Sequence, residues 1–295
     1  MKPIVILLRG GLGNQLFQLA AGIYVKDVLG REVRFSDIYL RGSPLKYRFF
    51  GITPRRMLIG DLLRQNEYEE ISIIKFVGLR FMRLMHKSFW TTEGDHNDTN
   101  SLLQRASICS RVLDGYFQDM LLTMQVREQI LARFRLSTEF RNVILGKSRN
   151  VIAVHIRFGD YVSNRSAKQM HGFTEPSYFQ NGISLLENRD NDLKIEVYSD
   201  DIFRARTFFS EFPIETQLRL EFQESQSEIS DMAKLSSAES LVICNSTFSW
   251  WAAWFASNLN NAKVVIPIPW LASPSNLDAR LTSINWHVLK REIAR

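Results

Sequence analysis

The sequence predicts an α/β fold of two domains built on parallel sheets. In the C-terminal half, short apolar runs rich in β-branched residues are typical of strands, at 151–157, 194–199, 218–222, 240–245 and 263–268. Helix-like segments separate these strands, near 176–186, 202–209, 228–237 and 249–259. Short apolar strands that alternate with helices indicate parallel βαβ units whose sheet is covered on both faces.

The N-terminal half opens with the same pattern. The apolar run 4–8 is a predicted strand, the loop RGGLGNQ follows it, and a helix-like segment then runs to Gly30, a common helix stop. Residues 119–146 also have a helical pattern. The simplest architecture has two α/β domains of similar size, 1–145 and 146–295, that face a cleft.

Composition and charge narrow the class of partner. Of 295 residues, 45% are hydrophobic and 23% are charged, as in an ordinary globular protein. The net charge of +6 comes without an RNP motif, zinc-finger spacing or basic zipper helix, so we expect no nucleic-acid partner and favour a phosphorylated small molecule. Two cysteines, no signal-peptide pattern and no apolar run of membrane-spanning length lead us to expect a cytoplasmic protein.

Ligands of parallel sheets bind outside the carboxyl ends of the strands, so the residues after each strand are the candidate site. After the first strand, Gly11 and Gly13 let backbone N–H groups approach a phosphate, and the helix N-terminus adds a favourable partial charge. Leu16 stands where a dinucleotide fingerprint needs its third glycine, which disfavours a dinucleotide oxidoreductase. A tight strand-to-helix turn without a ligand is the alternative for this loop.

His155 and Arg157 end the strand 151–157. They alternate with Ile156, so both side chains project from the same face of the strand. The planar fork of an arginine suits a phosphate because it donates two hydrogen bonds at once. The alternative is a structural pair of Arg157 with Asp160 beside a histidine whose hydrogen bonds are satisfied.

Acidic residues follow two further strands. Asp200 and Asp201 have no histidine or third carboxylate at ligand spacing, so we predict no metal site and weigh a helix cap as their alternative role. Asp231 lies in the first turn of a predicted helix, where acids are common. A buried carboxylate at this position would also accept hydrogen bonds from N1–H and N2–H of guanine, a pairing that adenine does not offer.

The stretch CNSTFSWWAAW, residues 244–254, crosses from a strand into a helix. Its Ser246, Thr247 and Ser249 are both good N-cap residues and good donors to a phosphate. The three tryptophans are predicted to pack against the sheet and to hold this turn rigid, and whether any of them touches a ligand stays open.

Together these stretches resemble the α-1,2-fucosyltransferases of glycosyltransferase family eleven. The segments GGLGNQLFQ, LDGYFQD, HIRFGD, YSDD and NSTFSWWAAW occur in the family's order, between residue 9 and about residue 255. One departure is Phe158, which stands where the family pattern H-x-R-R-x-D has a second arginine. It leaves Arg157 as the main phosphate-binding candidate.

The resemblance implies a GT-B fold with a GDP-fucose donor held mostly by the C-terminal domain. It also implies an inverting, metal-independent transfer of L-fucose to the 2-hydroxyl of a galactoside, with no cofactor. Arg157 would stabilise the leaving diphosphate, and Asp160 is our nominee for the general base. The residues assigned to the donor on this resemblance are Gly11, Gly13, Asn14, His155, Arg157, Asp200, Asp231, Ser246, Thr247, Phe248 and Ser249.

The acceptor is expected to be a galactose-containing glycan near the segment 163–179. Tyr161, Lys168 and His171 are the acceptor-binding candidates. Two alternatives stay open: a glycosyltransferase that uses another nucleotide sugar, and a non-catalytic nucleotide- or glycan-binding protein of the same fold.

The segment 71–90 combines apolar residues with Lys75, Arg80, Arg83 and Lys87. It predicts either a weak peripheral contact with the anionic inner face of a membrane or a packed helix with a solvated basic edge. The packed helix is the favoured interpretation.

Overall fold

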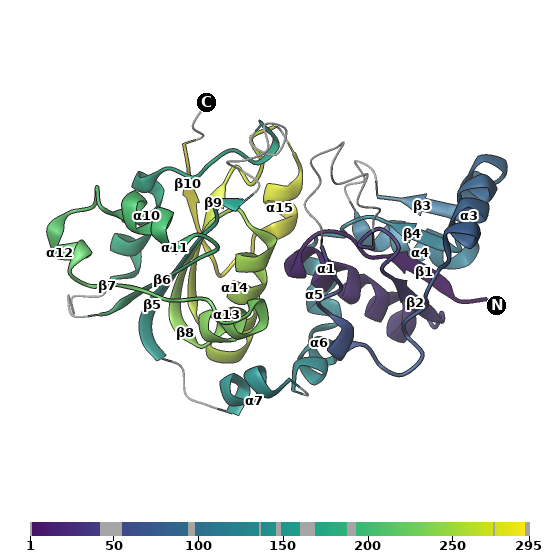
Figure 1. The fold of residues 1–295 in the computed structure, drawn as a ribbon, viewed down its shortest axis with the longest axis horizontal. Helices are drawn as coiled ribbons and strands as arrows, with labels where there is room; N and C mark the ends of the chain where they lie inside the picture. Colours follow the sequence, from purple (N-terminus) through teal and green to yellow (C-terminus); the bar gives the residue numbers. More distant parts are fainter. Residues whose placement is uncertain are drawn as a thin grey trace. The chain divides into compact units, whose positions relative to one another are not determined.

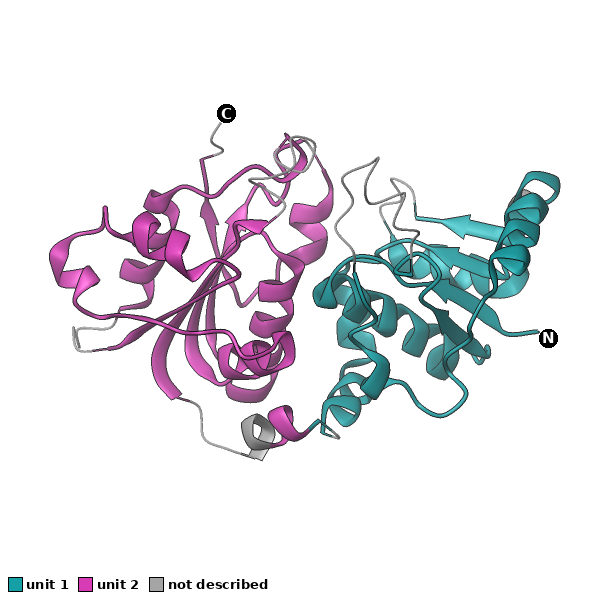
Figure 2. Ribbon diagram, in the orientation of Figure 1, with its two compact units in different colours: residues 1–137 teal, residues 138–295 magenta. Residues whose placement is uncertain are grey.

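The computed structural model describes residues 2–41, 55–93, 98–135, 137–145, 149–159, 169–187, 193–273 and 275–292. The chain divides into two compact units, Met1–Ser137 and Thr138–Arg295 (Figure 2). Helix α7 (Thr138–Leu145) belongs to the second unit, whereas the boundary predicted after residue 145 assigns it to the first. It joins the second unit because the Phe140 ring packs on the Phe255 ring, with centroids 4.9 Å apart.

Within the described residues, unit 1 holds a four-stranded parallel sheet in the order β2-β1-β4-β3 (Figure 1). Its strands are β1 (Ile4–Leu7), β2 (Val33–Ser36), β3 (Trp90–Thr92) and β4 (Val112–Asp114). Its helices are α1 (Leu12–Ile23), continued by a π-helical turn over Tyr24–Val28, α3 (Ile73–Met85), α4 (Thr99–Cys109), α5 (Met120–Gln125) and α6 (Arg127–Phe134), with 3-10 turns at Gly60–Leu62 and Lys87–Phe89. All four residues of β1 are buried, as expected for a central parallel strand.

The described part of unit 2 holds a six-stranded parallel sheet in the order β10-β9-β8-β5-β6-β7. Its strands are β5 (Arg149–Ile156), β6 (Ile195–Ser199), β7 (Leu220–Phe222), β8 (Ala238–Ile243), β9 (Lys263–Ile268) and β10 (His287–Lys290). Its helices after α7 are α10 (Pro176–Leu186), α11 (Ile202–Phe209), α12 (Ile214–Gln217), α13 (Glu228–Ser236), α14 (Thr247–Asn260) and α15 (Leu277–Leu281). The predicted α/β class with parallel sheets is confirmed.

The strand order of unit 2 is that of a Rossmann sheet. The chain enters at the central strand β5, winds outward through β6 and β7, and returns to β8 on the other side of β5. Helices α10 and α11 cover one face of the sheet, and α13 and α14 cover the other (Figure 1). Ile152 and Val154 pack in one core cluster with the α10 and α11 side chains, so the intervening residues of β5 face α13 and α14.

Helix α3 confirms the packed-helix interpretation of segment 71–90 only in part. Phe76 and Leu79 pack against a core cluster that includes Trp90, yet none of the described residues of α3 is fully buried. Large apolar side chains on the opposite face of α3 are exposed. Among the described residues, no helix has both the length and the hydropathy to cross a membrane.

Candidate functional site

The sheet of unit 2 has a switch point between β5 and β8, because the chain winds in opposite directions from these two neighbouring strands. Ligands of such sheets bind outside the carboxyl ends of the strands that flank this point. Arg157 directly follows β5, and Cys244, Asn245 and Ser246 follow β8. Several residues predicted to contact the donor therefore lie at the edge where this topology favours a ligand.

Arg157 is held by the turn that follows β5. The Asp200 carboxylate accepts hydrogen bonds from the backbone N–H groups of Phe158 (2.9 Å) and Gly159 (3.0 Å), and its Oδ2 lies 3.9 Å from Arg157 Nε. A Cβ atom at position 159 would lie 2.7 Å from Asp200 Oδ2, so the close approach of the carboxylate favours glycine there. Asp200 thus fixes the turn and lies beside Arg157, whose side chain is 24% exposed to solvent.

Phe158 occupies the position of the second arginine in the family pattern. Its ring is buried and stacks on the Phe173 ring, with centroids 5.4 Å apart, and it meets the edge of Phe208. A charged guanidinium in this aromatic cluster would lose its hydration without an obvious partner. Phe158 is therefore a core residue, and Arg157 supplies the positive charge of this turn.

Asp201 caps helix α11. Its carboxylate accepts a hydrogen bond from the backbone N–H of Arg204 at 3.0 Å, so the helix-cap role weighed for the Asp200–Asp201 pair belongs to Asp201. Among the residues that the structure describes, no group of three or more His, Cys, Asp or Glu side chains is arranged to hold a metal ion.

His155 lies beneath Arg157 on the α14 side of the sheet. It is buried, its Nδ1 lies 3.5 Å from Cys244 Sγ, and its ring packs on Phe248 with centroids 5.1 Å apart. Burial, reinforced by the positive charge of Arg157, lowers the pKa of His155 to about 3. The imidazole is therefore neutral near pH 7, and burial raises the pKa of the Cys244 thiol to about 11.

The neutral His155 predicts a specific acid sensitivity. The pKa of His155 is 6.5 in the unfolded chain and about 3 in the folded chain. Between these two pH values the histidine is protonated in the unfolded chain and neutral in the folded chain. Wild-type stability therefore falls as the pH decreases through this window, and His155→Gln should reduce the slope by up to about 1.4 kcal/mol per pH unit. Urea unfolding at several pH values measures the difference, with the exposed His287→Gln as the control. Equal slopes for wild type and His155→Gln would contradict it.

The turn from β8 into α14 carries the predicted phosphate donors. Ser246 is the N-cap residue, and within the described residues no side chain caps the first turn. The Ser249 hydroxyl is buried and donates within the turn, 3.1 Å from the Ser246 carbonyl oxygen, while Thr247 is partly exposed. The first N–H groups of a helix favour anions, so this N-terminus beside Arg157 is suited to a phosphate.

The tryptophans of α14 are core residues. Trp250, Trp251 and Trp254 are all fully buried, and their rings contact one another edge to face. Trp250 Nε1 also donates a hydrogen bond to the Leu281 carbonyl oxygen at 2.8 Å. The prediction that they pack in the core is confirmed, and full burial leaves none of the indoles exposed.

Asp231 lies in the first turn of α13, whose N-cap is Ser227. Its Oδ2 accepts a hydrogen bond from the Ser225 hydroxyl. Its Oδ1 is shielded from solvent and has no hydrogen-bond partner among the described residues. A shielded acceptor without a donor costs free energy, so Oδ1 is suited to an N–H group of a ligand.

The acceptor-binding candidates are only partly described. The backbone oxygen of His171 accepts hydrogen bonds from Asn245 Nδ2 (2.9 Å) and from the buried Arg291 (2.6 Å), which anchors it near the end of β8. The predicted base Asp160 and the candidates Tyr161 and Lys168 lie outside the described residues.

The glycine-rich loop links β1 to α1 in unit 1. Gly10 has φ +76°, and a Cβ there would lie 2.5 Å from the Asn14 side-chain nitrogen, so the turn requires glycine at this position, which sequence reasoning did not single out. Gly11 is the N-cap residue of α1, and Gly13 is buried in its first turn. Asn14 Oδ1 accepts a hydrogen bond from Gln118 at 2.9 Å, so the family segments GGLGNQ and LDGYFQD contact each other.

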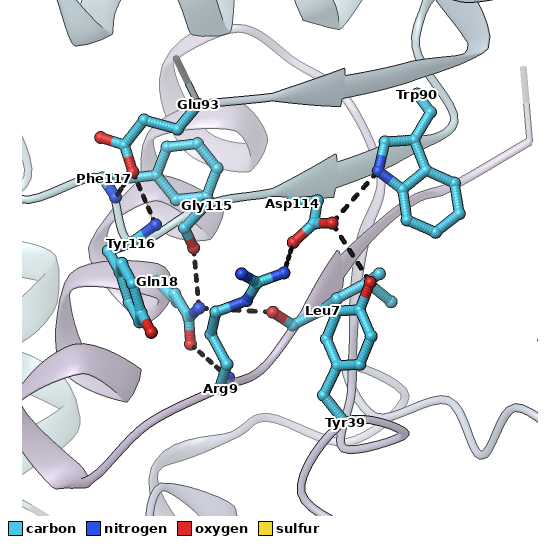
Figure 3. Close-up of polar contacts among 10 residues, drawn as sticks. All are labelled: Leu7, Arg9, Gln18, Tyr39, Trp90, Glu93, Asp114, Gly115, Tyr116 and Phe117. Carbon is cyan, nitrogen blue, oxygen red and sulfur yellow. Dashed lines mark hydrogen bonds and ion pairs between the residues drawn. The ribbon is translucent and has the colours of Figure 1, made fainter. Parts of the chain in front are cut away.

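Figure 3 shows a polar cluster at the carboxyl ends of β1 and β4 that the sequence did not reveal. Arg9 donates to one oxygen of the buried Asp114 carboxylate, and Tyr39 Oη (3.2 Å) and Trp90 Nε1 (3.3 Å) donate to the other. The Arg9 guanidinium also lies over the Tyr39 and Tyr116 rings, 4.8 and 5.7 Å from their centroids. Arg9 is therefore held by a buried carboxylate and two aromatic rings, and 32% of its side chain stays exposed to solvent.

Two side chains fix the backbone around this cluster (Figure 3). Gln18 accepts from the Arg9 backbone N–H and donates to the carbonyl oxygens of Leu7 and Gly115, which ties the ends of β1 and β4 together. Glu93 accepts from the backbone N–H groups of Tyr116 and Phe117. The only sequence signal for Asp114 was its place in the segment LDGYFQD.

The sequence model of glycosyl transferase family 11 matches residues 79–290. The chain belongs to this family. The resemblance proposed from the sequence is thereby confirmed, and this family 11 protein is a glycosyltransferase.

Two Escherichia coli relatives match nearly the whole of this family 11 glycosyltransferase. The O-antigen biosynthesis glycosyltransferase WbnK is 29% identical, over 95% of this chain and 98% of the relative. An alpha-1,2-colitosyltransferase is 28% identical, over 92% of this chain and 93% of the relative.

Two solved structures that match this family 11 glycosyltransferase have lower sequence identity than these relatives. The E. coli heptosyltransferase WaaC with ADP is 11% identical at a TM-score of 0.47, over 98% of this chain and 93% of that one. The fucosyltransferase NodZ from Bradyrhizobium is 13% identical at a TM-score of 0.40, over 88% and 93%.

Proposed function

We propose that this glycosyltransferase transfers L-fucose from GDP-fucose to the 2-hydroxyl of a galactose-containing glycan, with inversion and without a metal ion. Family membership supports glycosyl transfer itself. The guanine nucleotide is supported by one observation, the shielded Asp231 Oδ1 that lacks a donor. Guanine presents N1–H and N2–H side by side, and a carboxylate can accept a hydrogen bond from each. No other common base offers this pair of donors.

The diphosphate of the donor would meet Arg157 and the N-terminus of α14. As the bond between fucose and the diphosphate breaks, negative charge grows on the leaving oxygen. The Arg157 guanidinium, oriented by Asp200, and the N–H groups of the first turn of α14 are donors aimed at that charge. They are held before the reaction begins, so little reorganisation accompanies the charge transfer.

The acceptor hydroxyl would attack from the side opposite the leaving diphosphate, which inverts the anomeric centre. A base near that hydroxyl takes its proton, and Asp160 remains our nominee because it stands three positions after Arg157 in the sequence. His155 is unsuited to this role because it is buried and its pKa is about 3. Tyr161, Lys168 and His171 remain the proposed contacts to the acceptor.

Colitosyl transfer is the second candidate function. It is favoured by the alpha-1,2-colitosyltransferase, which matches this chain about as closely as the O-antigen biosynthesis enzyme does. A competition assay that offers GDP-fucose and a colitose nucleotide with one acceptor separates the two, because the preferred donor has the higher kcat/KM.

Nucleotide binding tests the guanine assignment. GDP at a hundred times its Kd should stabilise the protein by about 2.7 kcal/mol and raise Tm, whereas UDP and ADP at the same concentration should not. Asp231→Asn replaces one acceptor oxygen with an NH₂ donor and should lose most of the GDP shift. Glu228→Gln, which changes the other acid of the same helical turn, is the matched control.

Equal Tm shifts with UDP and GDP would refute the guanine assignment. A GDP shift without turnover of GDP-fucose on any galactoside would instead favour a non-catalytic binding protein. Turnover that is abolished by EDTA and restored by Mg²⁺ would refute the metal-independent mechanism.

A further inference from the structure

Helix α3 presents an apolar face to solvent. Ile74 is 86% exposed, Leu84 is 79% exposed and Phe81 is 60% exposed. Each residue of a helix turns by about 100°, so these positions fall on one side. The other large apolar residues exposed on this side are Ile73, Val77 and Met85. We call these six residues the α3 face.

The α3 face lies opposite the side of the helix that packs on unit 1. Phe76 and Leu79 make the packing contacts, against the cluster that contains Trp90. In Figure 1, α3 lies beside β3 within that unit. The helix is therefore anchored through one side, while the apolar side opposite to it contributes nothing to the core.

Basic side chains lie on the rest of the α3 surface: Arg80 is next to the α3 face, and Lys75 and Arg83 are nearer the side that packs on unit 1. The Arg80 guanidinium lies 5.9 Å from the Phe76 ring centroid, and that of Arg83 lies 5.5 Å from the Trp90 ring centroid. Lys75, nearer the packed side, pairs with Glu69. Residues 71–90 contain no aspartate or glutamate, so this segment carries a purely positive charge.

We infer that the α3 face docks on a lipid bilayer with anionic headgroups. A helix that lies in the interface buries its apolar side among the acyl chains and keeps its basic side chains at the headgroups. Phosphate-bearing lipids attract the arginines electrostatically, which complements the positive charge of the segment. The α3 helix of 13 residues is about 20 Å long, so it lies on the membrane and does not cross it.

A second copy of the chain is a poorer occupant for the α3 face. In a two-fold dimer the same patch meets itself, which would bring two copies of this positively charged segment together without compensating acids on the segment. An anionic bilayer complements both the apolar α3 face and the positive charge of the segment. This inference does not depend on the donor or the acceptor of the proposed reaction.

Vesicle flotation of the full chain tests the inference. The protein should float with vesicles of phosphatidylcholine mixed with phosphatidylglycerol, and less with phosphatidylcholine alone or at high salt.

Ile74→Glu with Phe81→Glu removes two large apolar side chains from the α3 face and should lower the partition coefficient on the order of a hundredfold. Ile74→Ser with Phe81→Ser is a gentler pair, should the glutamates impair folding. Leu218→Glu with Ile284→Glu is the matched control, because these residues of unit 2 are 80% and 98% exposed.

Three results would overturn the inference. The first is wild-type protein that does not float with the anionic vesicles, and the second is an α3 variant that floats as well as the control. The third is equal flotation with purely zwitterionic vesicles. A wild-type dimer that the α3 variant dissociates, detected by sedimentation without any flotation, would assign the face to a second copy.

Discussion

Replacing Arg157 with alanine is expected to lower kcat/KM by about 10²- to 10³-fold. Removing one preorganised donor from a developing negative charge typically has an effect of this size. The structure holds Arg157 next to Asp200, at the end of β5 and beside the α14 N-terminus. Arg157→Lys keeps the charge but loses the planar fork, so it should recover only part of the activity. Steady-state kinetics with varied GDP-fucose measure both variants.

The control for Arg157 is Arg206→Ala. It removes an exposed arginine of α11 whose guanidinium lies over the Phe222 ring. It should leave kcat/KM near the wild-type value. A loss confined to kcat, with the affinity for GDP unchanged, would show that Arg157 acts mainly in the transition state. Arg157→Ala activity within a few-fold of wild type would refute its role at the leaving group.

Glu67→Ala is expected to destabilise the protein by about 3–5 kcal/mol, because it leaves a buried guanidinium without its counter-charge. Glu67 and Arg133 are both buried in unit 1 and form a two-pronged ion pair, with N–O distances of 2.6 and 2.9 Å. Lys26 Nζ and the Arg64 backbone N–H also donate to the carboxylate at 2.8 Å. Urea unfolding at neutral pH measures the loss. The exposed Glu70→Ala, which breaks a surface pair with Arg41, should cost at most about 1 kcal/mol.

The Glu67 carboxylate also predicts that the free energy of unfolding decreases at acidic pH. Burial alone would raise the pKa of Glu67, but the hydrogen bonds from Arg133 and Lys26 outweigh it and lower the pKa from 4.5 to about 2. The stability from this ionised group is therefore present above pH 4.5 and is lost as the pH falls toward 2. A Glu67→Ala variant with the same acid dependence as wild type in this window would contradict the assignment.

Much of the local structure of unit 2 followed from sequence pattern. Helices α10 and α11 begin and end where the periodicity predicts, since Pro176 suits the first turn of α10 and Asp201 caps α11. Strand β10 was missed, because its four residues include exposed polar side chains at an edge of the sheet. Its pairing with β9, and not its composition, makes it a strand.

The sequence predicted some residues of the candidate site and missed others, because some of their contacts depend on tertiary packing. Arg157 and the 244–249 turn follow apolar strands directly, so the rule about carboxyl ends predicts them as candidates. Asp114 and its partner Arg9 are 105 positions apart, and no spacing rule relates them. The shielded Asp231 Oδ1 was likewise invisible, because its environment is set by the packing around α13.

By itself, the sequence determined what depends on neighbours along the chain: the alternation of strands and helices, the turns after the strands, and the motif order of the family. Only the tertiary structure decided which distant side chains meet and which faces stay uncovered. Arg133 reaches Glu67 across 66 positions, and α3 exposes an apolar side that its periodicity alone did not distinguish from a core face. Local propensities act over a few residues, whereas burial and ion pairing depend on how the finished elements pack.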